Sequence, residues 1–77
     1  MAIKVYFFGS LVDITGNSVS EFQLPPDTDS LNLQLQGMYP ALKLTKYFIA
    51  VNQQMIQSNQ PLLQGDVVAF MPPFSGG

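Results

Sequence analysis

Residues 63–77 read LQGDVVAFMPPFSGG, and this stretch carries most of the information about the fold. Residues 64–66 are typical of a turn, and the apolar run from Val67 to Met71 predicts a strand. Pro72 and Pro73 end that strand, because proline cannot donate a hydrogen bond to a sheet ladder. We therefore expect a last strand that leads directly into a tail.

The tail, residues 72–77, finishes with Gly76-Gly77. Glycine lacks a Cβ atom, so these two residues can pass through a channel too narrow for any side chain. The carboxylate of Gly77 is a poor electrophile until ATP converts it to a mixed anhydride. We expect the tail to extend up to about 20 Å from the body and to be activated by another protein. The alternative is an ordinary frayed terminus.

Length and composition limit the remaining possibilities. Seventy-seven residues make one small domain, residues 1–77. Hydrophobic residues make up 47% and charged residues only 10% of the chain, so we expect exposed apolar surface that marks a partner site. The net charge of −2, with three lysines and no arginine, excludes a basic surface for nucleic acid. No apolar run is long enough to span a membrane, and the first residues lack a signal-peptide pattern, so we expect a cytoplasmic protein.

The missing residue types exclude most catalytic sites. The chain has neither cysteine nor histidine, which excludes Cys–His and Ser–His–Asp catalysis and a histidine or thiolate metal site. Its five acids are dispersed, and Asp27 and Asp29 are typical of a helix start rather than of a catalytic carboxylate pair. We therefore expect that the chain catalyses nothing alone and itself binds no metal or cofactor.

Residues 28–39 are ambiguous. Leu31, Leu33 and Leu35 alternate as in a strand. A helical stripe is also present, made of Leu31, Leu35, Met38, Tyr39 and Leu42. The preceding acids favour the helix, which we expect from Thr28 to Tyr39, with the stripe in the core and Pro40 as its end. The other expected elements are strands over residues 2–8, 19–24, 47–52, 55–57 and 67–71, a short helical turn over residues 11–14, and a tight turn at residues 52–54. This order predicts an α+β roll with one helix on a sheet.

Three segments together resemble a known family: residues 3–8 (IKVYFF), residues 50–52 (AVN) and residues 63–77. They are similar to the small subunits of molybdopterin synthase, the MoaD-type sulfur carriers. The resemblance implies a ubiquitin-like β-grasp fold, with a mixed sheet, one main helix and a flexible Gly-Gly tail. Sulfur carriers of thiamine biosynthesis, the ThiS type, share the fold and the diglycine, but Pro72-Pro73 favours the molybdopterin branch.

The resemblance also implies a chemistry. A MoeB-type enzyme would adenylate the carboxylate of Gly77 with ATP, and the adenylate would become a thiocarboxylate. The tail would then enter a MoaE-type large subunit, where the sulfur would attack cyclic pyranopterin monophosphate to build the dithiolene of molybdopterin. The complex would be a heterotetramer of two small and two large subunits. The tail residues that would line the partner's channel are Pro72, Pro73, Phe74, Ser75 and Gly76.

Strand alternation identifies a candidate interface. It places Val68 and Phe70 in the core and turns the neighbouring side chains of the same strand outward. In a β-grasp fold the first and last strands are adjacent, so Phe8 would meet Met71 at the base of the tail. The expected interface residues are Tyr6, Phe8, Val67, Ala69 and Met71. The alternative is that they are scattered surface hydrophobes.

The chain departs from the family pattern at three positions. Val12 stands where an arginine is common, Met71 where a phenylalanine is common, and Phe74 where a smaller aliphatic residue is common. Val12 and Met71 are candidate partner contacts, and Phe74 is a candidate anchor. Two other functions stay open: a sulfur carrier for thiamine, and a β-grasp conjugation or binding module that carries no sulfur.

Overall fold

A five-stranded sheet and one long helix make up the fold of residues 2–73, the part of the chain that this computed structural model describes. Three connections depart from the plain sheet-and-helix plan, namely a short helix after the first strand, a 3₁₀ helix after the long helix, and an irregular segment before the last strand. In chain order the elements are β1 (Ala2–Phe7), α1 (Ser10–Thr15), β2 (Val19–Gln23), α2 (Thr28–Met38), η1 (Pro40–Leu44), β3 (Phe48–Val51), β4 (Gln54–Met55) and β5 (Val67–Met71).

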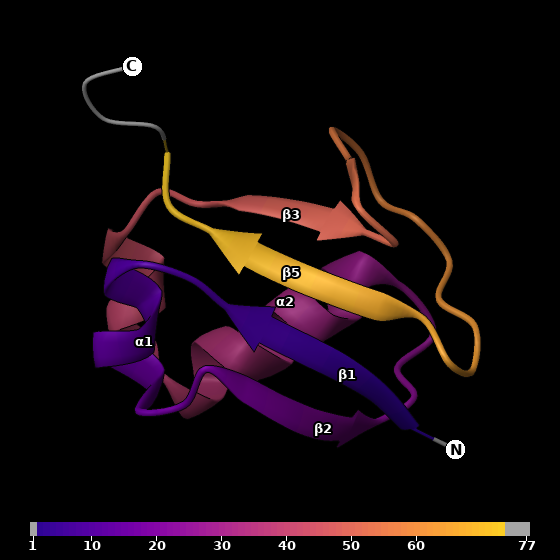
Figure 1. Cartoon of the computed structure of the whole chain (residues 1–77), viewed down its shortest axis with the longest axis horizontal. Helices are drawn as coiled ribbons and strands as arrows, with labels where there is room; N and C mark the ends of the chain where they lie inside the picture. The colour runs from indigo at the N-terminus through magenta and orange to yellow at the C-terminus, as the bar shows by residue number, and fades with distance from the viewer. Residues whose placement is uncertain (1, 74–77) are drawn as a thin grey trace.

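The sheet has the strand order β2-β1-β5-β3-β4 (Figure 1). β1 and β5 pair in parallel at its centre, with Phe7 opposite Phe70, and the other neighbouring strands are antiparallel. The predicted mixed sheet, with the first and last strands side by side, is therefore confirmed. Because β5 is central, the chain leaves the sheet at Met71 from a strand that is paired on both sides.

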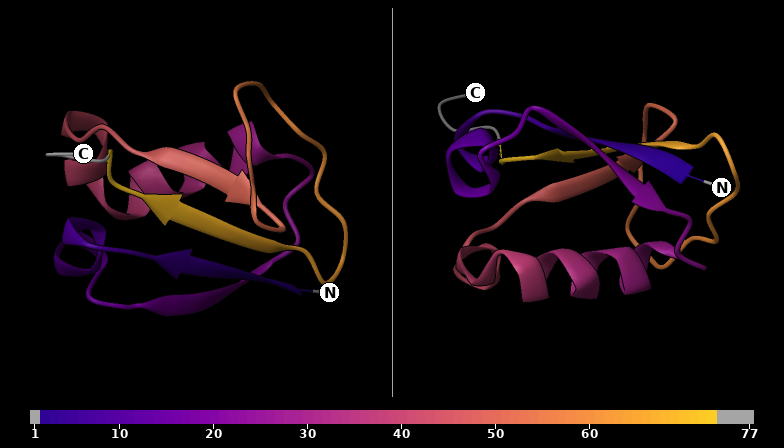
Figure 2. Two further views of the ribbon diagram at one scale, coloured as in Figure 1. Left: turned by 45° about the horizontal axis from the view of Figure 1, so that its top comes forward. Right: turned by 90° about the horizontal axis from the view of Figure 1, so that it is seen from below.

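Helix α2 covers one face of the sheet, and no helix of residues 2–73 lies over the other face (Figure 2). The covered face holds the core, because alternate residues of β1 and β5 point toward α2. Burying such a side chain stabilises the fold by roughly 1.5–3 kcal/mol. The most buried hydrophobic side chains of this core are Ile3, Val5, Phe7, Leu11, Leu31, Leu35, Leu42, Leu62, Val68 and Phe70.

Asp27 caps the start of α2, as the sequence predicted. Its carboxylate accepts a hydrogen bond of 2.8 Å from the backbone N–H of Ser30. Hydrogen bonds from the side chain and backbone of Ser30, and from the side chain of Asn59, lower the pKa of Asp27 below its ordinary value. The carboxylate of Asp27 therefore serves the fold, and the helix interpretation of residues 28–39 is confirmed to within one residue.

The C-terminal end of α2 differs from the prediction. Leu31 and Leu35 are buried as expected, but Met38 is 50% exposed, so its placement in the core was wrong. The helix ends at Met38, and Pro40 begins the 3₁₀ helix η1, which the sequence analysis did not foresee. The chain changes direction between α2 and η1. Met38 at the end of α2 is therefore exposed, and Leu42 on η1 is buried in the core.

The β3–β4 hairpin is tighter than predicted. Asn52 and Gln53 form a two-residue turn, with φ angles of 50° and 71°. β4 then covers Gln54–Met55, so the expected strand over residues 55–57 was placed one residue late and was too long. The amide of Asn52 donates to Asp66 at 3.0 Å and its oxygen accepts from the N–H of Val67, so the hairpin is tied to the start of β5.

Candidate functional site

The base of the tail lies against the connection between β1 and α1. β5 ends at Met71, Pro72 is half-buried, and Pro73 is exposed. Pro72 lies so close to Gly9 that a Cβ atom at position 9 would be 2.8 Å from its Cγ atom. Pro72 therefore packs on the backbone that follows β1, and this contact fixes the point at which the tail begins.

The remaining tail positions, Phe74, Ser75, Gly76 and Gly77, lie outside the described residues. The assignment of the reacting carboxylate to Gly77 stays a prediction, as do the extended tail and the anchoring role of Phe74. The described part of the site consists of Pro72, Pro73 and the surface around them.

The uncovered face of the sheet carries the residues predicted for the interface. Val68 and Phe70 are fully buried beneath it, which confirms the predicted face assignment of β5. Phe8 is 48% exposed, and its ring lies 6.5 Å from that of Tyr6, measured between ring centroids. The side chains on β5 are exposed at Val67 and half-buried at Ala69 and Met71. Their orientation is therefore as predicted, and their contact with a partner stays a prediction.

Three further side chains extend this surface. Val19, Phe48 and Met55 are all exposed. Val19 and Phe48 lie on strands that pair with those of the predicted residues, and Met55 on β4 pairs with Ala50 of β3, which in turn pairs with Ala69. Phe48 pairs with Met71 and Val19 pairs with Tyr6, and directly paired residues share a face of the sheet. The alternation in residues 47–52 was a signal that could have identified Phe48. We call the set the outer apolar face, and its members are Tyr6, Phe8, Val19, Phe48, Met55, Val67, Ala69 and Met71.

The positions that depart from the family pattern differ in their surroundings. Val12 lies on α1 and is partly buried against the hydrophobic core, so much of its side chain serves the packing of α1. Met71 is half-buried on the outer apolar face, next to the start of the tail. Of these two, Met71 is therefore better placed to contact a partner.

A hollow of about 400 Å³ lies beside Pro73, between α2, η1 and β3. Lys43 and Lys46 line it, so two of the three lysines of this acidic chain are close to the base of the tail. The hydroxyl group of Tyr47, directly before β3, donates a hydrogen bond to Asn32 and accepts one from Gln36. These bonds attach the start of β3 to α2. None of these residues was among the site residues predicted from the sequence.

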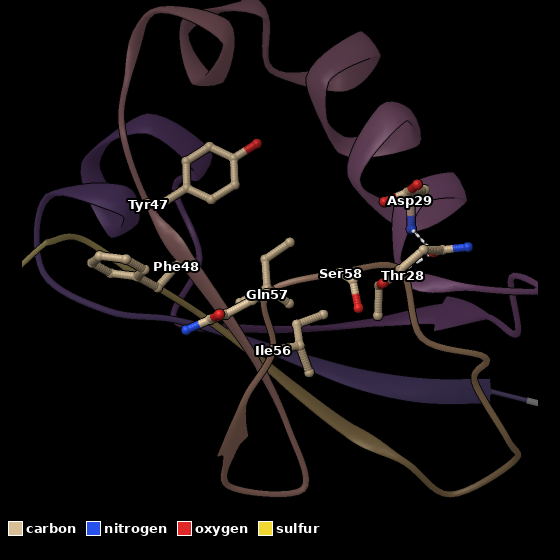
Figure 3. Close-up of a pocket in the computed structure, with 9 residues that line it drawn as sticks. Thr28, Asp29, Tyr47, Phe48, Ile56, Gln57 and Ser58 are labelled. Carbon is tan, nitrogen blue, oxygen red and sulfur yellow. Dashed lines mark hydrogen bonds between the residues drawn. The ribbon is translucent and has the colours of Figure 1, made fainter.

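A smaller hollow, of about 210 Å³, is lined by the start of α2 and by residues 56–59 (Figure 3). The side-chain oxygen of Asn59 accepts hydrogen bonds from the hydroxyl of Thr28 at 3.2 Å and from the N–H of Asp29 at 2.8 Å. These bonds attach the loop before β5 to the helix. The hollow is smaller than most ligand sites, which run from about 300 to 1,000 Å³, and its polar groups serve the fold.

Within residues 2–73 there is no group of three or more acidic, cysteine or histidine side chains that could hold a metal ion. In the same part of the chain, no helix is long and apolar enough to cross a membrane. Asp66 has a lowered pKa because it accepts hydrogen bonds from the side chain of Asn52 and from the N–H of Leu63. Its carboxylate is therefore engaged in holding the turn before β5.

Comparison with known proteins gives consistent matches over the whole chain. The sequence profile of the ThiS family matches residues 5–77. The chain is 34% identical to the molybdopterin synthase sulfur carrier subunit of Escherichia coli strain K12, over 97% of this chain and 99% of that protein. It is also 34% identical to the protein of the same description from Chlamydomonas reinhardtii, over 100% of both chains.

Solved structures agree with these sequence matches. The putative molybdopterin converting factor subunit 1 of Pyrococcus furiosus superposes with a TM-score of 0.86 at 24% identity, over 95% of this chain and 98% of that one. A chain from the complex of subunits 1 and 2 of the molybdopterin-converting factor of Helicobacter pylori 26695 superposes with a TM-score of 0.73 at 32% identity, over 100% of both chains. The first likeness shows the β-grasp fold, and the second relative was solved together with its partner subunit.

Proposed function

The chain belongs to the molybdopterin synthase sulfur carrier subunits of the ThiS family, and we propose from this premise that Gly77 is the residue that carries the sulfur. Its place is in molybdenum cofactor biosynthesis. The observation that supports the proposal is the match to sulfur carriers over the full length, in a chain that ends in Gly76-Gly77. A cysteine-free chain has no sulfur nucleophile of its own, so the sulfur must be added to a group such as this carboxylate.

The first step activates the carboxylate. One oxygen of Gly77 attacks the α-phosphorus atom of ATP and pyrophosphate leaves, which gives an acyl adenylate. Hydrosulfide, HS⁻, then displaces AMP, so that a C–S bond replaces the C–O bond to phosphate, the S–H proton is lost and a thiocarboxylate results. We propose that a MoeB-type adenylating enzyme binds the ATP and supplies the catalytic groups, since this chain has no cysteine or histidine.

The second step transfers the sulfur. The tail, residues 72–77, enters the large subunit, and the thiocarboxylate sulfur attacks a carbon atom of cyclic pyranopterin monophosphate. Water then hydrolyses the acyl C–S bond to the carrier, which releases the carboxylate of Gly77 and leaves the sulfur on the pterin. A second carrier supplies the other sulfur of the dithiolene in the same way. Glycine at positions 76 and 77 suits a narrow channel because it presents no side chain. Pro72 and Pro73 suit its entrance because their φ angles are fixed, which reduces the freedom lost when the tail enters.

The partner for this second step is a MoaE-type large subunit. A 32% identical relative was solved in complex with subunit 2 of its molybdopterin-converting factor. We infer that this chain binds its large subunit through the outer apolar face, in a heterotetramer with two copies of each subunit. Exposed Phe8 and Phe48 lie on that face and support this inference, because contiguous apolar surface marks protein–protein sites. The complex is expected in the cytoplasm.

Intact mass measurement tests the proposed function. The chain is incubated with an adenylating partner, ATP and a sulfur source, and its mass is compared with a sample lacking ATP. Replacing the terminal –OH by –SH adds about 16 Da. Sulfur transfer to a precursor pterin in the presence of the large subunit would distinguish this function from thiamine biosynthesis. Conjugates through Gly77 to lysines, without the mass increase, would contradict sulfur carriage.

A further inference from the structure

Gly9 occupies an unusual backbone conformation at the end of β1. Its φ angle is 58° and its ψ angle is −135°, a combination that residues with a side chain rarely adopt. It is also in close contact with the base of the tail. A Cβ atom at position 9 would lie 2.8 Å from Cγ and 3.4 Å from Cδ of Pro72. Both the conformation and the contact therefore require glycine.

Two other glycines share the positive φ angle of Gly9 but not its close contact with another residue. Gly16 and Gly65 have φ angles of 76° and 86°, so they too adopt a conformation that favours glycine. A Cβ atom at either position would have no heavy atom within 4 Å. Among the described glycines, Gly9 alone combines a positive φ angle with a close approach of another residue, and that residue is Pro72.

The backbone around Gly9 is held in place on both sides. The N–H of Phe8 donates to the carbonyl oxygen of Phe70 at 3.1 Å, and the N–H of Val12 donates to the carbonyl oxygen of Gly9 at 3.1 Å. The first bond attaches this segment to β5, and the second attaches it to α1. A clash caused by a side chain at position 9 is therefore relieved most easily by movement of Pro72, which is only half-buried.

We propose that Gly9 is a positioning residue for the sulfur-carrying tail, and that it acts through Pro72. Without a Cβ atom it lets the Pro72 ring pack on the β1–α1 connection, and this contact sets the position of Pro72 and Pro73, where the tail begins. This inference rests on the proposed function, because a partner has to bind the outer apolar face and receive the tail at the same time. A displaced Pro72 would start the tail from a wrong position relative to that face, so the two contacts could not both form correctly.

The test compares Gly9→Ala with two controls, Gly16→Ala and Gly65→Ala. All three changes place alanine at a positive φ angle, but Gly9→Ala alone adds a clash with Pro72. Steady-state thiocarboxylation by the adenylating partner is followed by intact mass, and each variant's melting temperature is recorded. We expect a fall in melting temperature in all three variants, largest in Gly9→Ala because alanine there is both strained and in contact with Pro72. A fall in kcat/KM of about tenfold is expected in Gly9→Ala alone, below the roughly hundredfold loss that a 1 Å misplacement can cause.

A second comparison identifies Pro72 as the residue through which Gly9 acts. Pro72→Ala removes Cγ, the atom that would clash, together with Cδ. In that background, Gly9→Ala should change kcat/KM less than about twofold, because only backbone strain remains. An equal loss with and without Pro72→Ala would overturn the inference, as would a Gly9→Ala variant that matches both glycine controls.

The inference and the proposed function fail in different ways. If the unaltered chain gains no sulfur, the proposed function is wrong. The contact itself is then tested on the isolated chain by carbon-detected NMR. Gly9→Ala should shift the signals of Met71, Pro72 and Pro73, and Gly16→Ala should not. Shifts confined to the β1–α1 connection would contradict a role for Gly9 in placing the tail.

Discussion

Phe48 of β3 lies directly opposite Met71 of β5, and both side chains are on the face of the sheet that α2 leaves uncovered. Phe8 reaches the same end of the sheet from the other side of β5, since its N–H bonds to the carbonyl oxygen of Phe70. Two exposed aromatic side chains therefore flank Met71, the last strand residue before the tail. Under the proposed function, a partner that receives the tail would contact both of these side chains.

Phe8→Ala should weaken the complex with the large subunit by roughly 1–3 kcal/mol, the range of a significant interface contact. Phe8 is 48% exposed in the isolated chain, so its removal should change the melting temperature little. Calorimetric titration with the large subunit, together with a melt of the isolated carrier, measures both effects. Phe70→Ala is the control, because that side chain is fully buried, and its loss should destabilise the fold by about 3–5 kcal/mol. Unchanged affinity with a strongly lowered melting temperature would show that Phe8 is a core residue.

Phe48→Ala should weaken the same complex by a similar amount, roughly 1–3 kcal/mol. The residue is 46% exposed and was identified from its pairing with Met71. Leu44→Ala is the control, because Leu44 is 91% exposed but lies on η1, outside the outer apolar face. If both variants bound alike, exposure rather than location would explain the result, and the interface would have to be placed elsewhere.

Deletion of Gly77 should abolish the mass increase of about 16 Da and leave the melting temperature unchanged. The deletion removes the proposed reacting carboxylate, while the hydrogen bonds and core described here lie within residues 2–73. Gly76→Phe should also prevent activation, because a bulky side chain would have to pass the partner's channel. Thiocarboxylate formation in the Gly77 deletion would be incompatible with the proposed carrier chemistry.

Asp27 should contribute to the acid sensitivity of the fold. Its pKa is lowered in the folded state by hydrogen bonds from Ser30, so its stabilising effect is present above the ordinary value of 3.8 and is lost as the pH falls through the lower folded value. Asp27→Asn keeps an N-cap acceptor but does not titrate. The melting temperature of the variant should therefore fall less than that of the unaltered chain on acidification below 3.8. If the melting temperatures of the variant and the unaltered chain fell equally with pH in this range, the acid sensitivity would come from other carboxylates.

Gln53→Gly should stabilise the fold by up to about 1 kcal/mol. Gln53 has a φ angle of 71° in the two-residue turn after Asn52, and Asn-Gly is the preferred sequence of a type I′ hairpin turn. Urea denaturation measures the change. Gln57→Gly is the control, because Gln57 has no positive φ angle, and there glycine should be neutral or destabilising. Equal effects at the two positions would contradict strain at Gln53.

Local sequence signals predicted the elements that depend on them. The cap at Asp27 and the spacing of Leu31 and Leu35 identified α2, and alternation placed Val68 and Phe70 in the core. Pro40 was interpreted only as a helix end. Proline also suits the first turn of a new helix, which is why η1 and the exposure of Met38 were missed.

The candidate site was predictable in part for the same reason. Strand periodicity identified Phe8 and Met71, because the orientation of a strand residue depends on its position along the strand. It says nothing about where a connection crosses a neighbouring element, so the contact between Gly9 and Pro72 could not be foreseen. That contact depends on the parallel pairing of β1 and β5, which brings together residues 63 positions apart.

The same parallel pairing determines how the domain responds to a mechanical load. A pull on the tail acts along β5, which is held laterally by β1 and β3. The inter-strand hydrogen bonds run across the strands, so a pull along β5 loads all of them together in shear. They therefore do not break one after another from the end of the strand. If a partner draws in the tail as proposed, the force is shared along the whole of β5. Attachment to a central strand would then let the proposed reacting terminus be pulled repeatedly without unravelling the domain behind it.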